Sequence, residues 1–244
     1  LPISYPRFNS PEEIGDTMVN LGFNLVSLAN NHTMDKGEIG VINSVNYWKT
    51  KPGVYYSGQA LSSSDRQSNI KVEEKNGIKY AFLAPSGKEY LTNIYSKEKA
   101  QKDINKLKDK VDLIIVSMHW GEEYVTTPNN SQKQIAKELS DMGVNLVIGN
   151  HAHMIEPVEK INNTLVFYAL GNFIAAQDTN DKQTGALVTL NINKDKNGKI
   201  TFSNVKANLL YTYFKGSHNF KVYPYTKLNN SLLNNYETYY NKYK

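Results

Sequence analysis

The feature that most constrains the fold is a set of short apolar runs, each followed by a polar segment that contains histidine. The runs cover residues 23–28, 111–118 and 144–148, and the histidines that follow them are His32, His119, His151 and His153. Short runs rich in Val, Ile and Leu are typical of buried strands. Helical patterns lie between them, so the chain is predicted to be α/β at first, with antiparallel β-structure later.

Helix and hairpin signals fill most of the remaining chain. Helices are expected at residues 10–21, 38–50, 97–110 and 131–142, and an amphipathic Leu and Tyr stripe predicts another from residue 227 onward. The first begins with Ser10-Pro11-Glu12-Glu13, which predicts a capping box. A further strand is expected at 165–170, and Lys-Asn-Gly segments predict hairpins at 75–77 and 196–198, the second with a type I′ turn. We expect a single domain over residues 1–244, with a C-terminal β-hairpin and helix at 186–244.

Composition excludes several kinds of chemistry. The 244 residues include no Cys, which rules out disulfides, thiolate metal sites and Cys nucleophiles. The net charge of +5 comes from Lys residues scattered along the chain, so we expect a solvated surface and no nucleic-acid partner. The alternative role for these lysines is to attract a polyanion, an attraction that added salt would weaken. No apolar run approaches the ~20 residues that a membrane span needs.

The strand-end histidines predict a metal site. Ligands of covered α/β sheets gather beyond the carboxyl ends of the strands, so the imidazoles converge if these strands are neighbours. In His151-Ala152-His153 both rings lie on one side of an extended backbone, which suits one metal ion or two adjacent ions. A lone histidine is more often an ordinary core or surface residue, but three repeats of the pattern favour ligands. His218 follows no such run and is expected in a solvated loop.

Four segments together resemble the CapA (also PgsA) poly-γ-glutamate capsule-synthesis family. They are residues 27–37 (SLANNHTMDKG), 117–124 (SMHWGEEY), 149–153 (GNHAH) and 169–173 (ALGNF), in the family's order and spacing. The resemblance implies a calcineurin-like metallophosphoesterase fold, a four-layer α/β/β/α sandwich of mixed sheets around a two-metal site. Ala152 stands where the family usually has Pro, and Asn150 where it often has His. Neither difference removes a ligand.

The resemblance also implies roles for individual residues. Asn31 looks like the amide ligand of the metal, and His119, His151 and His153 match its imidazole ligands. His32 is similar to the histidine that gives a proton to the leaving group.

Other polar residues are expected to support this site or to contact substrate. Asp35 would brace the Asn31-His32 loop, or else cap the following helix. Glu123 would orient a histidine or contact substrate, and a solvated loop acid is the alternative for it and for Glu122. Asn150 and Asn172 are the remaining candidates, Asn172 from a tight turn at 171–173.

The acidic ligands of the family lie in segments that belong before Pro11, a strand ending in Gly-Asp and an Asn-x-Glu segment, and this chain has neither. The nameable ligands are therefore neutral, which favours one weakly held Zn²⁺ or Mn²⁺ ion. The resemblance implies one or two ions of the Mn, Zn or Fe class. The first residues of this chain read as a loop. We therefore expect the carboxylates to lie in an N-terminal segment that is missing from this chain, or that remains docked to it as a separate peptide. A native protein without them, working as a binding component, is the alternative.

Three functions remain open at this point. The first is a capsule-assembly protein on the extracellular face of the cell membrane, anchored by an N-terminal segment outside this chain. It would act on poly-γ-glutamate or another anionic substrate together with membrane-bound capsule-synthesis components. The second is an active metal-dependent phosphoesterase or amide hydrolase with His32 as general acid. The third is an interaction domain without catalysis, and the sequence leaves open whether the chain is an enzyme.

Overall fold

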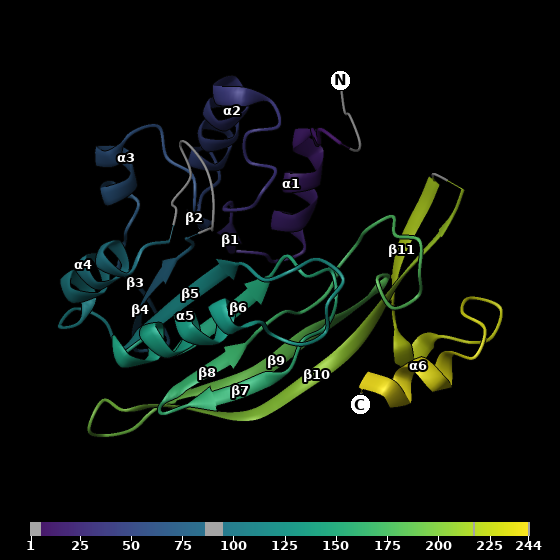
Figure 1. The fold of residues 1–244 in the computed structure, drawn as a ribbon. Helices are drawn as coiled ribbons and strands as arrows, with labels where there is room; N and C mark the ends of the chain where they lie inside the picture. Colours follow the sequence, from purple (N-terminus) through teal and green to yellow (C-terminus); the bar gives the residue numbers. More distant parts are fainter. Residues whose placement is uncertain (1–5, 86–94, 217, 244) are drawn as a thin grey trace. The chain divides into compact units, whose positions relative to one another are not determined.

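The structure is a computed structural model that describes residues 6–85, 95–216 and 218–243. The chain forms two compact units, residues 1–119 with 141–146 and residues 120–140 with 147–244. Both units combine helices with β-strands, which confirms the predicted α/β class (Figure 1). The four-layer arrangement and the single domain stay predictions, and the loop expected at the first residues lies largely outside the described part.

The first unit carries short parallel and antiparallel strands with helices between them. Its elements are α1 (Glu12–Asn20), β1 (Leu25–Ser27), α2 (Gly37–Lys49), β2 (Tyr55–Ser57), α3 (Ser63–Ser68), β3 (Glu73–Lys75), β4 (Ile78–Leu83), α4 (Lys97–Leu107) and β5 (Leu113–His119). Strand β1 pairs in parallel with β2, and β4 pairs in parallel with β5 and antiparallel with β3. The hairpin predicted at 75–77 is confirmed, with Asn76 and Gly77 at φ 53° and 75°.

Apolar side chains at helical spacing fix α2 against β2. Val41 and Val45 are fully buried and pack with Leu28 and Tyr56 in one cluster. Strand β5 is buried from its first residue to Met118, as its continuous apolar run predicts. By contrast, β1 is only half-buried and ends at Ser27, so the prediction of a buried strand at 23–28 is wrong in length and burial.

The second unit contains a long antiparallel sheet. Its elements are α5 (Asn130–Asp141), β6 (Leu146–Asn150), β7 (Val158–Ile161), β8 (Thr164–Phe167), β9 (Thr184–Lys194), β10 (Ile200–Lys215), β11 (His218–Pro224), the 3₁₀ turn η1 (Tyr225–Lys227) and α6 (Tyr236–Tyr243). The strand order is β6-β8-β7 in one sheet and β11-β10-β9 in the other. Of the helices that the structure describes, none is long and apolar enough to cross a bilayer.

The C-terminal segment differs from the sequence prediction. His218 begins β11 rather than lying in a loop, and the helix predicted from residue 227 begins only at Tyr236. Leu228 and Leu233 nevertheless reach a core cluster with Tyr225, because η1 and the turns after it carry them there. The apolar residues of the predicted stripe therefore do pack into a core cluster, although its leucines lie before α6 and not on a helix.

The hairpin predicted around 196–198 is confirmed by the antiparallel pairing of β9 with β10, but its predicted turn type and the predicted capping box of α1 are wrong. Helix α1 has Pro11 as its N-cap, and among the described residues no side chain caps it, so Ser10 lies outside the capping position. At 196–198 it is Gly198 that takes the left-handed conformation (φ 81°), while the Asp195 carboxylate accepts from the N–H groups of Asn197 and Lys199. An Asp that binds its own turn and a left-handed Gly are typical of a longer hairpin loop rather than of a two-residue type I′ turn.

Gly149 in β6 has no room for a side chain. A Cβ there would overlap the Tyr168 carbonyl oxygen and Trp120 Nε1, two atoms joined by a 2.8 Å hydrogen bond. We expect Gly149→Ala to lower the free energy of unfolding by about 3 kcal/mol, since backbone cannot yield as a side chain can. Gly198→Ala is the control, because its Cβ would meet nothing within 4 Å and only the left-handed backbone costs energy, about 1 kcal/mol. Urea unfolding checks this, and equal losses in both variants would contradict it.

Candidate functional site

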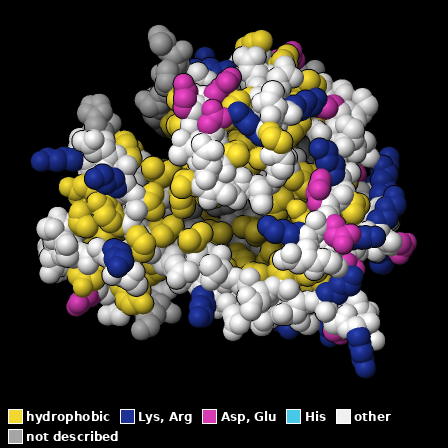
Figure 2. All heavy atoms as spheres, turned by 180° about the vertical axis from the view of Figure 1, so that it is seen from behind, with side chains coloured by type: hydrophobic (Ala, Val, Ile, Leu, Met, Phe, Trp, Pro, Cys, Tyr) yellow, Lys and Arg dark blue, Asp and Glu magenta, His cyan; other side chains and the backbone are white. Residues whose placement is uncertain are grey.

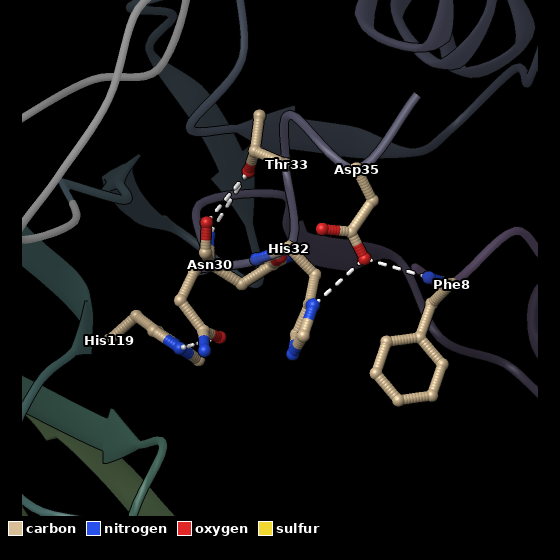
Figure 3. Close-up of polar contacts among 7 residues, drawn as sticks. Phe8, Asn30, His32, Thr33, Asp35 and His119 are labelled. Atoms are coloured by element: carbon tan, nitrogen blue, oxygen red, sulfur yellow. Dashed lines mark hydrogen bonds and ion pairs between the residues drawn. The ribbon is translucent and has the colours of Figure 1, made fainter. Parts of the chain in front are cut away.

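The loop after β1 is fixed by its own polar side chains. The Asn30 carboxamide oxygen accepts from the His32 N–H at 2.8 Å, and the Asn30 carbonyl accepts from the Thr33 hydroxyl at 2.9 Å (Figure 3). Such Asx turns are a common way to fold a chain back on itself after a strand. Gly58 (φ 113°) lies against this loop, where a Cβ would be 2.5 Å from the Ala29 nitrogen. The loop is therefore held from within and from the end of β2.

His32 is oriented by a carboxylate and by an aromatic ring. Its Nδ1 lies 2.8 Å from Oδ2 of Asp35, which also accepts from the Phe8 N–H at 2.7 Å (Figure 3). The Phe8 ring packs edge-on to the imidazole, with 4.6 Å between centroids. A carboxylate oxygen accepts and does not donate, so the proton lies on Nδ1 and Nε2 is the nitrogen that exchanges protons. Asp35 thus braces the loop through His32. In the described part of the chain, its side chain makes no capping hydrogen bond to helix α2.

Two predicted ligands of the first unit lie together. His119 is the last residue of β5, and its Nε2 is 3.0 Å from Oδ1 of Asn31 (Figure 3). An imidazole nitrogen and an amide oxygen are both ligands of divalent ions. Since an amide oxygen only accepts, His119 Nε2 donates to Asn31, and this contact joins the end of β5 to the loop after β1.

The two histidines of the second unit follow β6 in a bent segment. His151 and His153 have φ of 107° and 56°, and their ring centroids are 6.5 Å apart. The prediction of an extended backbone for this pair is therefore wrong, because β6 ends at Asn150. Positive φ is rare for residues other than glycine and is found often at functional sites. The bend is held by the Tyr124 N–H, which donates to the Ala152 carbonyl at 2.7 Å.

Asn172 determines which nitrogen of His153 carries the proton. Its amide nitrogen donates to the Lys182 carbonyl at 2.7 Å, so its oxygen is the atom that faces His153 Nδ1 at 2.9 Å. A carbonyl can only accept, which fixes the orientation of the amide. His153 Nδ1 must then donate, and in the neutral ring Nε2 has the free electron pair. This is the state of a histidine that ligates metal through Nε2.

Tyr124 and Lys182 restrain the same imidazole from its face. The Tyr124 ring stacks on His153 with 5.8 Å between centroids, and Lys182 Nζ lies 3.9 Å from the centre of the Tyr124 ring. Lys182 also pairs with Asp178 at 2.9 Å, and this hydrogen bond lowers the pKa of Asp178. Burial and the Glu123 charge raise the pKa of Tyr124. Sequence reasoning missed Lys182, because a lysine in a loop has no pattern that indicates such a contact.

The other predicted residues lie on the surface. Glu123 and Asn150 are exposed, and the Asn150 carbonyl accepts from the Trp120 N–H at 3.1 Å. Glu122 accepts from the Asn129 amide at 3.3 Å. Their exposure is compatible with substrate contact, which stays a prediction.

A buried carboxyl that the sequence did not indicate supports the turn after His153. Glu156 is only 5% exposed, and its Oε2 accepts from the Gln132 amide at 2.7 Å. Burial raises the pKa of Glu156. Gln132 also accepts from the Asn129 N–H at 2.9 Å and lies directly against Gly121. The pair therefore joins the start of α5 to the segments that follow β5 and β6.

The predicted ligand atoms are of types that bind divalent ions, but too few of them are seen together among the described residues to form a metal site. In each unit the structure shows a pair of the predicted ligands, and a zinc ion takes at least three protein ligands. Among residues 6–85, 95–216 and 218–243 there is no group of three or more His, Cys, Asp or Glu that could hold a metal ion. The metal site therefore stays a prediction.

Comparison with known proteins identifies the family. The family model described as "Bacterial capsule synthesis protein PGA_cap" matches residues 2–177, which include all the predicted ligands and the His32 loop. The chain belongs to this family. The resemblance found in its sequence motifs is thereby confirmed.

Curated members of the PGA_cap family show the same relationship. This chain is 32% identical over 190 residues to the PGA biosynthesis protein CapA of Bacillus subtilis, covering 74% of this chain and 50% of that protein. It is 30% identical to the capsule biosynthesis protein CapA of Bacillus anthracis, covering 75% and 47% of the two chains. The chain thus spans about half the length of the curated relatives it matches.

More distant similarities extend to other bacteria. A probable polyglutamine synthesis accessory protein of Mycobacterium tuberculosis is 27% identical over 61% of this chain and 44% of its own. The crystal structure of TT1561 of Thermus thermophilus covers 80% of this chain and 92% of its own, at 11% identity and a TM-score of 0.41. Similarity at that level carries no argument about fold or function.

The Asn172 contact makes a prediction about the His153 tautomer. In the native protein at neutral pH we expect the Nδ1–H form of neutral His153. Asn172→Leu removes the acceptor, so the ring should shift toward the Nε2–H form that free histidine prefers. ¹⁵N NMR of histidine-labelled protein measures this. Asn193→Leu, exposed on β9, is the matched control, and an unchanged His153 spectrum in Asn172→Leu would contradict the assignment.

Proposed function

We propose that this chain is the part of a capsule-synthesis protein that binds poly-γ-glutamate, or a similar anionic polymer, during capsule assembly. The observation that carries the proposal is the family match over residues 2–177. Relatives named for capsule biosynthesis and for polyglutamine synthesis support it. Its place of action would be the outer face of the cell membrane, beside membrane-bound components of capsule synthesis.

A divalent ion of the Mn, Zn or Fe class is part of this proposal. Asn31 and His119 in the first unit, and His151 and His153 in the second, are the proposed ligands of one or two such ions. Such an ion, when bound, supplies positive charge that polarises a substrate oxygen. The tautomer of His153 supports this assignment, since it leaves the Nε2 electron pair free. A bound ion would take the place of the hydrogen bond between His119 Nε2 and Asn31 Oδ1.

The second candidate function is hydrolysis, and the contacts of His32 favour it. When the ring is protonated, Nδ1–H stays on the Asp35 carboxylate and Nε2–H is the proton available to a leaving group. The Asp35 carboxylate and the Phe8 ring keep the imidazole from turning. After the transfer the ring is neutral and Nε2 can accept a proton from water. His32 is 38% exposed, so substrate can reach it.

Chromosomal alleles in the source bacterium test both functions. Deleting the gene should lower cell-surface poly-γ-glutamate at least about tenfold, measured chemically on washed cells. His32→Ala should match the deletion if proton transfer is required, because a general acid contributes about 100-fold or more to a rate. It should keep near-normal polymer if the chain acts in assembly alone.

His218→Ala is the control allele, because His218 lies at the start of β11 and outside the predicted site. It should leave the polymer unchanged. A deletion strain with normal surface polymer would contradict the proposed function.

A further inference from the structure

A cavity lies beside the His32 loop within the first unit. Its volume is about 540 Å³, and it is lined by Arg7, Asn31, Met34, Asp35, Lys36 and Gly37. This volume is in the range of ligand-binding sites, about 300–1,000 Å³. Asn31 and Asp35 belong both to this cavity and to the predicted site, so a ligand here would lie next to His32.

The cavity carries an excess of positive charge. Arg7 and Lys36 supply two cations against the single carboxylate of Asp35. Neither cation forms an ion pair with any residue that the structure describes, whereas Lys49, Lys51 and Lys182 each pair with an aspartate. The Asp35 oxygen Oδ2 is already shared by His32 and the Phe8 N–H. With respect to the described residues, both cations are available to bind an anion.

The contacts that orient His32 also place these cations. Arg7 precedes Phe8, whose N–H is held by Asp35, and Lys36 follows Asp35 directly. Lys36 is also the N-cap residue of α2, a position that prefers Ser, Thr, Asp or Asn. A lysine there stabilises neither the helix end nor its dipole, so stability does not explain it. Residues that break a local rule are expected at functional sites.

Charge on one face of the molecule is dispersed. On the face shown in Figure 2, Lys and Arg side chains are scattered among acidic and neutral ones and do not merge into a continuous patch. A local pair of cations at a cavity is therefore a more specific anion site than that face as a whole.

We propose that this cavity binds the free α-carboxylates of poly-γ-glutamate, with Arg7 and Lys36 as the residues that hold them beside His32. The inference rests on the proposed function, which supplies a polymer with one free carboxylate on every residue. The Arg7 guanidinium can bind a carboxylate through two N–H groups, and the Lys36 ammonium supplies a second charge for the next carboxylate. The cavity is open, which a polymer segment requires.

Calorimetric titration of a short poly-γ-glutamate oligomer into the purified chain tests this inference. We expect Arg7→Ala/Lys36→Ala to weaken binding at least about tenfold, since it removes charge-assisted hydrogen bonds. Lys75→Ala/Lys110→Ala is the matched control, because both lysines are exposed, lie in the same unit and remove the same net charge. The control should change the affinity less than twofold. Thermal unfolding verifies that both double variants are folded.

Three outcomes would overturn the inference. They are equal losses in both double variants, no binding of the oligomer to the native chain, and displacement by inorganic phosphate at lower concentrations than by free glutamate. The last would indicate a phosphate site instead. Equal losses in both double variants, or preference for phosphate, would overturn the cavity assignment alone. No binding to the native chain would also contradict the binding role in the proposed function, and a normal capsule in the deletion strain would contradict its role in capsule assembly.

Discussion

The predicted site of the first unit depends on the hydrogen bonds that the Asp35 carboxylate accepts. One oxygen atom accepts from the His32 ring and from the Phe8 N–H, and it thereby fixes the imidazole and the backbone at Phe8. Asn172 acts in the same way in the second unit, because its oxygen fixes Nδ1 of His153. In both cases an atom that can only accept a hydrogen bond decides that Nε2 is the reactive nitrogen. Neighbouring side chains thus determine which ring nitrogen carries the proton in His32 and in His153.

The elements that the sequence predicted well are those with strong local causes. Strand β5 follows from its continuous apolar run, and the 75–77 hairpin follows from an Asn-Gly pair that both take positive φ. Strands β7 and β11 were missed because their side chains alternate weakly, although each pairs with a strand that is its neighbour in the chain, β7 with β8 and β11 with β10. The segment from 227 carries an apolar stripe, yet packing around Tyr225 rather than helical propensity determines its path.

The candidate site shows the same division between local and tertiary causes. The position of each histidine after an apolar run was readable, because polar groups collect where strands end. Asp35 was also within reach of local reasoning, being in the same loop as His32. Phe8, Lys182 and Gln132 act through a backbone N–H, a carbonyl and a buried amide that no sequence pattern marks. The bend at His151 and His153 was missed because alternation along a strand was assumed beyond the end of β6.

The central proposal for these residues is that Asn31, His119, His151 and His153 bind divalent metal. The most direct test is calorimetric titration of Mn²⁺ and Zn²⁺ into the metal-free native chain and into His119→Ala, His153→Ala and His218→Ala. The account predicts binding that weakens about tenfold or more in the first two variants and is unchanged in the third. Equal binding by all four proteins, or no binding by the native chain, would contradict it.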